Sequence, residues 1–405
     1  MMVYLDNAAT TKPYEIVLKY MNEIQTERYG NPSSVHSMGM VAERELKNAG
    51  DKIARTLNTE RGNLIFTSGG TEADNMAVMQ PFFDMKKRGK REIVTSAVEH
   101  PAVNSPCDYY EDNGSEVVRI NVNENGMIYL EQLEEVLKND DKNISLISVM
   151  YVNNEVGTIQ PINEICKIKS DYTGRGKTDL IFHTDAVQAY GKLPLDLSSN
   201  NNGEIDLMTL SAHKIHGPKG VGALFARDPN KIKPLLKGGG QQNNLRSGTE
   251  NVAAIAGFGY AAEIQNSDIE GRMEKVAALR KMLLQGFLEN IDNIKINSPM
   301  EVSLLGEAGK CIPSILSVSF IGTKAEVILH SLEQKGIYVS TESACSSKKR
   351  GSSPVLTAMG MNPDEIEGTL RFSISTFNTE DEIDYTIQET KIAVEKFRKL
   401  TGYRK

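Results

Sequence analysis

Short apolar runs alternate with helical patterns through the first part of the chain, and this alternation constrains the fold most. Continuous apolar runs are typical of parallel strands buried on both faces of a sheet. A helical pattern, Glu131–Leu137, lies between two of these runs. The sequence therefore predicts βαβ units and an α/β fold with a mainly parallel sheet flanked by helices. The apolar runs are Leu64–Phe66, Ile93–Val94, Ile144–Tyr151, Leu180–Phe182 and Leu207–Leu210.

The pattern changes after about residue 260, where apolar residues from Met273 to Leu283 recur at helical spacing in a charged segment. Strands and helices in this mixture are typical of a smaller α+β domain. We expect a large domain over residues 14–260 and a small domain over residues 261–405 together with 1–13. The predicted elements of the small domain are strands at Ile315–Phe320, Ile337–Ser340 and Leu370–Ser375, a helix at Ala325–Gln334 and a last helix from about Thr379.

Composition and charge exclude several classes of function. The 405 residues carry 46 basic and 53 acidic side chains, a net charge of −7, which argues against nucleic acid as the main partner. No uncharged apolar run approaches the roughly 18 residues that span a bilayer, and we expect no signal peptide and no membrane association. None of the four cysteines forms a C-x-x-C pair, so we expect free thiols, no bound metal and a reducing, cytoplasmic location.

The polar residues that follow each apolar run are candidates for a ligand site, because open α/β sheets bind ligands beyond the carboxyl ends of their strands. The segment Thr67–Glu72 follows the first run and begins a helix. Small residues and free backbone N–H groups at a helix N-terminus suit a phosphate. A tight turn in which Thr71 caps the helix over Asp74 explains the same residues, and the pattern leaves both interpretations open.

Four more polar residues follow the next runs. His100 and Asn154 are as well explained by a structural histidine and a turn as by a function. Asp185 emerges from a buried run and needs a cationic partner to offset its desolvation. Lys214 follows the last run, where a lysine in a pocket can act as a nucleophilic amine, although most lysines are simply exposed.

Together, a phosphate cradle, a lysine amine and a buried carboxylate predict pyridoxal 5'-phosphate as cofactor. The lysine binds its aldehyde covalently, and the aspartate keeps the pyridine nitrogen protonated, so that the ring accepts electrons. A nucleotide site needs neither residue. The phosphate-loop motif G-x-x-x-x-G-K-[ST] is absent from the sequence, and so is G-x-G-x-x-G after a first strand.

Motifs along nearly the whole chain resemble those of cysteine desulfurases of the NifS/IscS group, pyridoxal-phosphate enzymes of fold type I in the class V aminotransferase family. A single short motif of this kind can occur by chance, but chance does not explain so many of the family's motifs in the same order along one chain. The motifs are Tyr4–Thr11, Gly30–Ser34, Thr67–Glu72, Glu99–Pro101, Val152–Gly157, Asp185–Gln188, Ser211–Lys214, Arg246–Thr249, Ser343–Ser346 and Leu370–Ser373.

The resemblance implies roles for the matching residues of this chain. Lys214 holds the cofactor, Asp185 pairs with the pyridine nitrogen, and His100 stacks on the ring and moves protons. Asn154 contacts cofactor and substrate, and Arg371 binds the substrate carboxylate, a task that suits its planar fork. The resemblance further implies that Thr249 reaches the cofactor phosphate of a neighbouring subunit, hence a homodimer with shared active sites. The remaining cofactor ligands that it implies are Gly70, Thr71, Gln188, Ser211 and His213.

The resemblance implies that Cys345 is the nucleophile of a sulfur transfer. L-Cysteine gives L-alanine, and the sulfur stays on Cys345 as a persulfide for acceptor proteins in iron–sulfur cluster, thio-cofactor or thiolated tRNA synthesis. Cys345 stands among serines and the basic run 348–350, whose positive charge favours a reactive thiolate over a buried structural thiol. Glu342 replaces a glycine that is common in the family, and its carboxylate is expected to affect the rate.

Three alternatives remain open on the sequence. A selenocysteine lyase uses the same residues, so the sequence does not separate it from a desulfurase. Another aminotransferase of this fold would not need Cys345. A scaffold protein without activity would not need the full set of site residues.

Overall fold

The computed structural model describes residues 1–83, 92–140, 144–174, 180–198, 203–341 and 353–402. Its largest sheet has seven strands in the order β2-β8-β7-β6-β5-β3-β4. All of its neighbouring strands are parallel except β8, which is antiparallel to β2 and β7. The predicted α/β fold with a mainly parallel sheet is confirmed. The strands are β2 (Leu64–Thr67), β3 (Glu92–Ser96), β4 (Glu116–Ile120), β5 (Ile144–Ser148), β6 (Ile181–Asp185), β7 (Leu207–Ser211) and β8 (Gly222–Ala226).

Helices cover both faces of this sheet, and neighbouring residues of one strand pack into different cores. Phe66 lies in the core with α2, α6, α7 and α8, whereas Ile65 lies in the core with α3. Helix α5 packs beside α3, on the side of the sheet where Ile93 and Leu146 are buried. Both faces of the strands are therefore buried, as the continuous apolar runs predict. The helices are α1 (Glu15–Glu27), α2 (Ser37–Thr56), α3 (Gly70–Val78), α5 (Pro101–Asp112), α6 (Leu130–Lys138), α7 (Ile162–Thr173) and α8 (Val252–Asn266).

Strands β4 and β8 are not among the predicted runs. Strand β8 begins at Gly222, and a Cβ there would lie 2.6 Å from the Leu210 carbonyl oxygen and 2.7 Å from the Gly69 carbonyl carbon. Only glycine allows this close approach of three backbones. Strand β8 is apolar but has no β-branched residue, and its first residue is a glycine, so it lacks the composition by which a strand is recognised in sequence.

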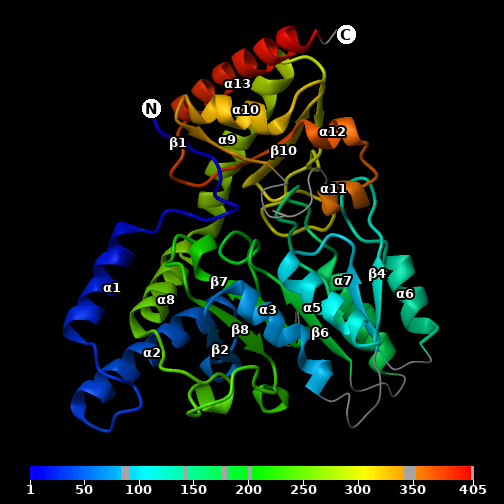
Figure 1. Cartoon of the computed structure of the whole chain (residues 1–405). Helices are drawn as coiled ribbons and strands as arrows, with labels where there is room; N and C mark the ends of the chain where they lie inside the picture. The colour runs from blue at the N-terminus through cyan, green and yellow to red at the C-terminus, as the bar shows by residue number, and fades with distance from the viewer. Residues whose placement is uncertain (84–91, 141–143, 175–179, 199–202, 342–352, 403–405) are drawn as a thin grey trace.

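A second, smaller unit lies above the large sheet in Figure 1. Its four-stranded antiparallel sheet has the order β12-β13-β10-β9, and β1 pairs with β11 as a separate parallel pair. The predicted strand Ile337–Ser340 is therefore two short strands in different sheets. The elements are β1 (Val3–Tyr4), β9 (Ile294–Ile296), β10 (Ile315–Phe320), β11 (Ile337–Tyr338), β12 (Ser340–Thr341), β13 (Thr369–Ser373), α9 (Ile269–Asn290), α10 (Ala325–Glu333), α11 (Pro354–Ala358), α12 (Pro363–Glu367) and α13 (Glu380–Thr401).

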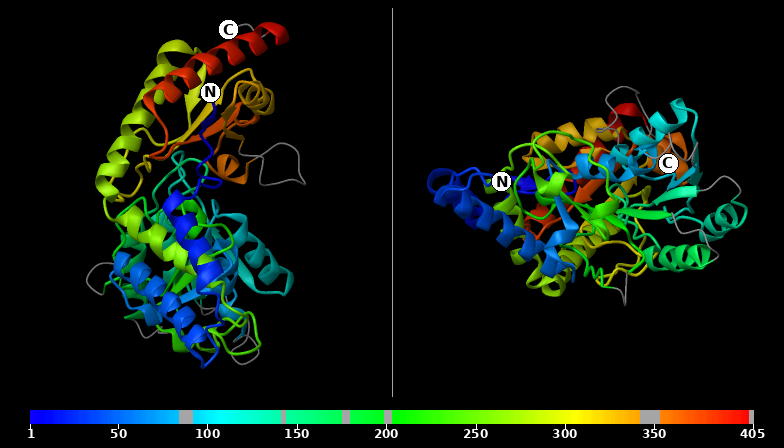
Figure 2. Two further views of the ribbon diagram at one scale, coloured as in Figure 1. Left: turned by 90° about the vertical axis from the view of Figure 1, so that its left-hand side faces the viewer. Right: turned by 90° about the horizontal axis from the view of Figure 1, so that it is seen from below.

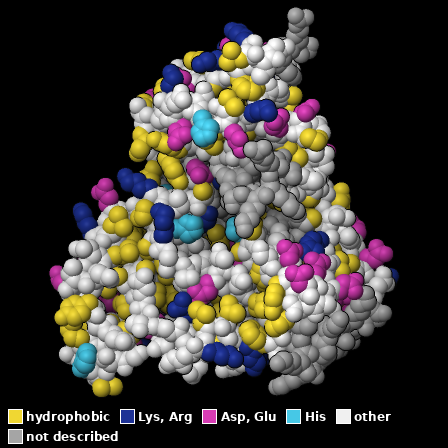
Figure 3. Space-filling model, viewed as in Figure 1, with side chains coloured by type: hydrophobic (Ala, Val, Ile, Leu, Met, Phe, Trp, Pro, Cys, Tyr) yellow, Lys and Arg dark blue, Asp and Glu magenta, His cyan; other side chains and the backbone are white. Residues whose placement is uncertain are grey.

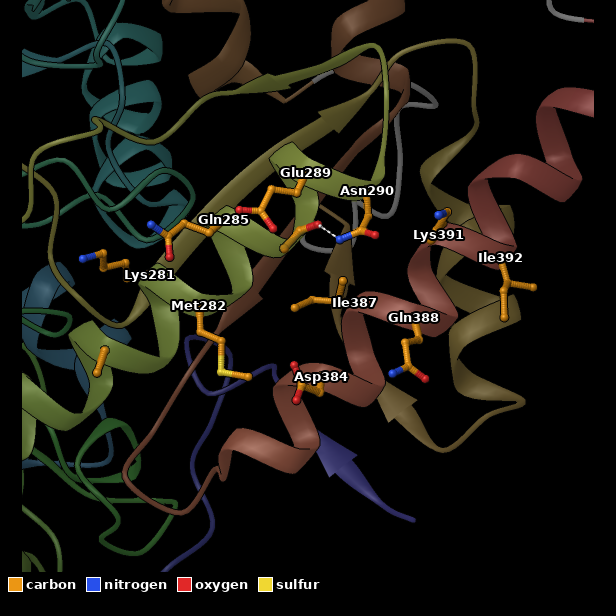
Figure 4. Close-up of a pocket in the computed structure, with 12 residues that line it drawn as sticks. Lys281, Met282, Gln285, Glu289, Asn290, Asp384, Ile387, Gln388, Lys391 and Ile392 are labelled. Atoms are coloured by element: carbon orange, nitrogen blue, oxygen red, sulfur yellow. Dashed lines mark hydrogen bonds between the residues drawn. The ribbon is translucent and has the colours of Figure 1, made fainter.

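Helices α9 and α13 run along one outer side of the smaller unit (Figure 2). They approach closely at Gly286, where an added Cβ would lie 2.2 Å from Cδ1 of Ile387. A shallow cavity of about 840 Å³ lies between the two helices, lined by Met282, Gln285, Asp384 and other residues (Figure 4). None of the predicted site residues lines it, so this cavity is not the candidate site.

The two units have separate hydrophobic cores, and we propose that they are the two domains expected from the sequence. In the smaller core, Phe287, Phe320 and Phe372 pack with ring centroids 5.1–6.4 Å apart. Helix α8 packs on α1 and α2, whereas α9 packs on β10 and α13, so the packing changes between Asn266 and Ile269. Among the described residues, no helix combines the length and apolar character needed to cross a membrane.

Candidate active site

The N-terminal segment Asp6–Thr11 brings predicted site residues together beyond the carboxyl ends of β6 and β7. Lys214 Nζ donates hydrogen bonds to the carbonyls of Ala8 and Ala9, the latter at 2.8 Å. Gln188 Nε2 donates to the same Ala8 oxygen at 2.9 Å. His213 Nδ1 lies 3.1 Å from the hydroxyl of Thr10. Residues from distant parts of the chain thus meet at one short segment. Figure 3 shows histidine side chains gathered on this face between the two units.

Lys214 owes its position to strand β7. The strand ends at Ser211, and the short 3₁₀ helix η2 (Ala212–Lys214) places Lys214 just beyond the sheet edge. Strand β6 lies next to β7 and ends at Asp185. The carboxyl ends of neighbouring parallel strands meet at one sheet edge, so the fold places the lysine and the aspartate in one site.

Asp185 and His100 form the electrostatic centre of the site. Asp185 is 6 % exposed, and its Oδ1 accepts a hydrogen bond from the Val187 N–H at 2.9 Å. Burial raises the pKa of Asp185, while the charges of His100 and Lys214 act in the opposite direction. A cation bound against this carboxylate would offset its desolvation. The predicted pairing of Asp185 with a protonated pyridine nitrogen fits this environment.

His100 is the N-cap of α5, and its Nδ1 accepts a hydrogen bond from the Ala102 N–H at 3.1 Å. Burial lowers the pKa of His100, so the neutral imidazole is favoured. Because Nδ1 accepts, the neutral ring carries its proton on Nε2. His100 therefore has a fixed tautomer next to Asp185 and Lys214, as a residue that holds or moves a proton requires.

The segment predicted to hold a phosphate lies where β2 leads into α3. The helix begins at Gly70 with Gly69 as its N-cap, so the alternative in which Thr71 caps the helix is wrong. The N–H groups of the first helical turn have no partner within the helix. Ser211 lies next to Gly70 at the start of this helix and is 1 % exposed. Its hydroxyl has no hydrogen-bond partner in the part of the chain that the structure describes. A buried donor beside a helix N-terminus fits an anionic phosphate.

An ion pair between Arg246 and Glu72 stabilises the turn that leads into α3. Arg246 donates two hydrogen bonds to the Glu72 carboxylate, at 2.8 and 3.1 Å, and the Ser68 N–H donates a third at 2.8 Å. Burial acts to raise the pKa of Glu72, but these hydrogen bonds outweigh it and lower the pKa. Thr249 follows Arg246 on the same loop and is exposed. The pair therefore connects the predicted phosphate cradle to the loop predicted to serve a neighbouring subunit.

Arg371 connects both units at the site. It lies on β13 and is 5 % exposed. Its Nη1 donates to the Asn154 carbonyl at 3.0 Å, and its Nη2 lies 3.1 Å from Asp6 Oδ1. The Asn154 contact with Arg371 is therefore made by the backbone, while its side chain is half-buried. A fixed guanidinium at this position suits a carboxylate ligand.

Cys345 and Glu342 lie outside the described residues, but both flanks of their segment meet the site. On one flank, Ser340 of β12 pairs with Arg371 of β13. On the other flank, the Ser353 hydroxyl donates to the carboxylate of Glu155. The described residues on either side of the segment 342–352 therefore lie next to Arg371 and Asn154, the two predicted substrate residues.

Sequence reasoning missed two buried ionisable residues at the site. Glu99 is 4 % exposed, accepts hydrogen bonds from the Ser96 hydroxyl at 2.6 Å and the Met150 N–H at 2.9 Å, and burial raises its pKa to about 8. Lys192 is 7 % exposed, and its Nζ donates to Gln188 Oε1 at 2.7 Å. Glu99 is next to His100 in sequence, and Lys192 stands four residues after Gln188, a spacing that could have drawn attention to it.

Comparison with known proteins decides the family. The class-V aminotransferase family model matches residues 3–386. The chain belongs to this family. Its relatives include the cysteine desulfurase IscS of Dictyoglomus turgidum, 38% identical over 402 residues, which cover 99% of this chain and 97% of that protein. The IscS of Methanosarcina thermophila is 39% identical over 399 residues, 98% of this chain and 93% of that protein.

Solved structures of class-V enzymes agree with these relatives. A NifS-like protein superposes with a TM-score of 0.86 at 35% identity, covering 98% of this chain and 100% of that one. A NifS-like protein from Rickettsia africae superposes with a TM-score of 0.84 at 31% identity and the same coverage. Enzymes of this family use pyridoxal phosphate, and the buried hydroxyl of Ser211, the carboxylate of Asp185 and the amine of Lys214 fit that cofactor.

Proposed function

We propose a role for each site residue in the cysteine desulfurase reaction, the activity to which the full-length similarity points. In this reaction L-cysteine and an enzyme thiol give L-alanine and an enzyme persulfide. The Cβ–S bond of the substrate breaks and leaves its electron pair on Cβ, a sulfur–sulfur bond forms on the enzyme, and one proton replaces the sulfur on Cβ of the product. When bound, pyridoxal phosphate supplies the electron sink that weakens the substrate bonds next to the amino group.

The observation that carries the proposal is that Lys214 and Asp185 meet at the ends of the adjacent parallel strands β7 and β6, where His100, which follows β3, acts electrostatically on Asp185. Lys214 holds the cofactor and then removes the substrate Cα proton with its freed amine. Asp185 accepts from the protonated pyridine nitrogen, whose positive charge offsets the desolvation of the buried carboxylate. His100 stacks on the cofactor ring and carries a proton on Nε2, because its Nδ1 is occupied by the Ala102 N–H.

The phosphate and substrate contacts follow from the same geometry. Gly70 and Thr71 supply N–H groups at the start of α3, and Ser211 and His213 bind from the end of β7. Arg371 binds the substrate carboxylate from the smaller unit, and Asn154 contacts cofactor and substrate from the larger one. The thiolate of Cys345 attacks the substrate sulfur and keeps it as a persulfide.

We further propose a homodimer in which Thr249 reaches the cofactor phosphate of the partner subunit. Thr249 is exposed, so its side chain is available to a neighbouring molecule. Several large apolar side chains on and between α1 and α2 are exposed, which is typical of a surface that another chain covers. They are Ile16, Leu18, Tyr29, Val35 and Met40, of which Val35 is 97% exposed.

The sulfur acceptor is proposed to be a protein of iron–sulfur cluster, thio-cofactor or tRNA-thiolation synthesis, and the location to be the cytoplasm. Three cysteines, Cys107, Cys166 and Cys311, are free and buried, in keeping with a reducing compartment.

The test is the intact mass of the holoenzyme after brief exposure to L-cysteine without reductant. We expect a gain of one sulfur atom, matched by L-alanine in solution and absent from Cys345→Ala. Cys166→Ala is the matched control and should still gain one sulfur atom, because Cys166 is only 6% exposed and has no proposed role in the reaction. No mass gain and no alanine from an enzyme that has bound its cofactor would overturn the proposed function.

A further inference from the structure

A buried lysine, Lys192, contacts predicted cofactor-binding residues but has no role in the proposed reaction. It follows β6 and is 7 % exposed. Its Nζ donates to Gln188 Oε1 at 2.7 Å, and Gln188 Nε2 donates to the Ala8 carbonyl at 2.9 Å. Lys214 Nζ donates to that same carbonyl. A chain of three hydrogen bonds therefore runs from Lys192 through Gln188 and Ala8 to Lys214.

This chain fixes which end of the Gln188 amide faces each neighbour. A lysine ammonium has donors only, so the amide atom that it contacts is the oxygen. The Ala8 carbonyl has acceptors only, so the amide atom facing it is the nitrogen. The reversed amide would place two oxygens against each other at Ala8 and an N–H against the ammonium. Lys192 and Ala8 therefore select one of the two orientations of the Gln188 amide.

The selected orientation determines what Gln188 offers to a bound ligand. Gln188 Nε2 uses one amide hydrogen at the Ala8 oxygen, which also accepts from Lys214 Nζ, and its second amide hydrogen is left for a bound ligand. We propose that Lys192 is a positioning residue, which makes Gln188 a hydrogen-bond donor toward the ring oxygen of the cofactor. The inference rests on the proposed function, in which Lys214 holds the cofactor, and on the role of Gln188 as a cofactor ligand that the resemblance implies.

The surroundings of Lys192 are basic. The charged and titratable groups that act on it, or on which it acts, are Lys214, Arg371, His213 and His216. Burial, followed by the charges of Lys214 and Arg371, lowers the pKa of Lys192 to about 7. A second amine beside Lys214 is costly in such surroundings, because like charges repel and burial disfavours the charged form of Lys192. Its retained contact with Gln188 offsets part of this cost.

The experiment follows the visible absorption of the bound cofactor in the holoenzyme as pH is varied. A donor at the ring oxygen draws electron density from it. Without that donor, the oxygen attracts the proton on the Lys214 nitrogen more strongly, so the pH at which the absorption changes rises. We expect Lys192→Met to raise this midpoint by about one pH unit and to weaken cofactor binding about tenfold.

Two further variants make the result specific. In a Gln188→Met background, Lys192→Met should add no shift, because Lys192 acts through the amide. Lys169 is a matched control: it is 4 % exposed and donates to Glu204 O and Asp206 Oδ2, both at 2.7 Å, away from the site. Lys169→Met should lower the unfolding temperature and leave the midpoint unchanged.

Each contrary result has one meaning. An unshifted midpoint in Lys192→Met overturns the positioning role. A shift that persists in the Gln188→Met background overturns it too, because Lys192 then acts by its charge alone. An equal shift in Lys169→Met overturns it by showing a general effect of destabilisation. A pH-dependent cofactor absorption that survives in the Lys214→Ala variant contradicts the proposed function, and with it the proposal.

Discussion

Arg371 and Asp6 form an ion pair with Nη2 and Oδ1 3.1 Å apart, although 365 residues separate them in sequence. Asp6 lies in the segment that also contacts Lys214 and Gln188. Arg371 lies on β13 of the smaller unit and bonds the Asn154 carbonyl of the larger one. The N-terminal segment thus fixes the proposed carboxylate-binding residue relative to the proposed cofactor lysine.

Arg371→Met should raise the KM for L-cysteine and lower kcat/KM about 100-fold, because a charge-assisted hydrogen-bond pair contributes about 3 kcal/mol. The absorption of the bound cofactor should remain, since Arg371 has no proposed cofactor contact. Steady-state alanine production measures both constants. Arg398→Met is the control, because Arg398 also bonds three backbone carbonyls, of Ile321, Asp292 and Asn293, but far from the site. An unchanged KM in Arg371→Met would contradict substrate binding by this residue.

Lys214→Ala should lose the covalent link to the cofactor and reduce the turnover number by at least about 10³-fold, since one group serves as both amine and base. Mass spectrometry after chemical reduction of the linkage locates the modified lysine. Lys219→Ala is the nearby control, because Lys219 is exposed and has no proposed role. Cofactor found on Lys219 or another lysine would contradict the assignment of Lys214.

Arg246→Met should weaken cofactor binding several-fold, because Glu72 would lose two of its three hydrogen bonds and hold the Ser68–Gly70 turn less firmly. The dissociation constant from equilibrium dialysis measures this change. The exposed pair Arg61–Asp51 has the same 2.8 Å contact but lies away from the cradle. Arg61→Met should therefore leave cofactor affinity unchanged, and equal affinities in both variants would show that the Arg246 pair is unrelated to the cradle.

Much of this site could be predicted from the sequence because strand ends locate it. Asp185 and Lys214 each follow an apolar run, and the ends of neighbouring parallel strands meet at one edge. The roles of single residues came from the resemblance rather than from the pattern. The pattern alone left the Thr67–Glu72 turn open between a phosphate cradle and a cap by Thr71, and only the backbone at Gly69 decides against the cap.

The parts that could not be predicted depend on contacts between distant segments. Lys214 Nζ donates to the backbone carbonyls of Ala8 and Ala9. Because every residue has a backbone carbonyl, the amino-acid sequence does not indicate which carbonyls the lysine contacts. Lys192 carries no sign of burial in a chain where most lysines are exposed. Strand β8 lacked a β-branched core pattern because Gly222 has to fit against β7 and Gly69. In each case tertiary packing determines the structure, and local sequence patterns do not record it.

Glu99→Gln should change how stability depends on pH. Burial raises the pKa of Glu99 from 4.5 to about 8, so the folded protein favours the protonated carboxyl. Between these two values the folded state holds a proton that the unfolded state releases, and the free energy of unfolding therefore falls as pH rises, by an amount on the order of 4 kcal/mol. Glutamine resembles the protonated acid, and its oxygen can still accept from Ser96 and Met150. Thermal unfolding of the holoenzyme at pH 5, 6.5 and 8 should show that the unfolding temperature of the variant increases relative to that of the wild type as pH rises.

Glu111→Gln is the control. The pKa of Glu111 is lowered by Arg119, so this carboxylate stays ionised over the whole range, and the unfolding temperature of Glu111→Gln should differ from that of the wild type by a constant amount. Parallel curves for Glu99→Gln and the wild type would mean that Glu99 is ionised in the folded protein and is paired with a cation when the cofactor is bound.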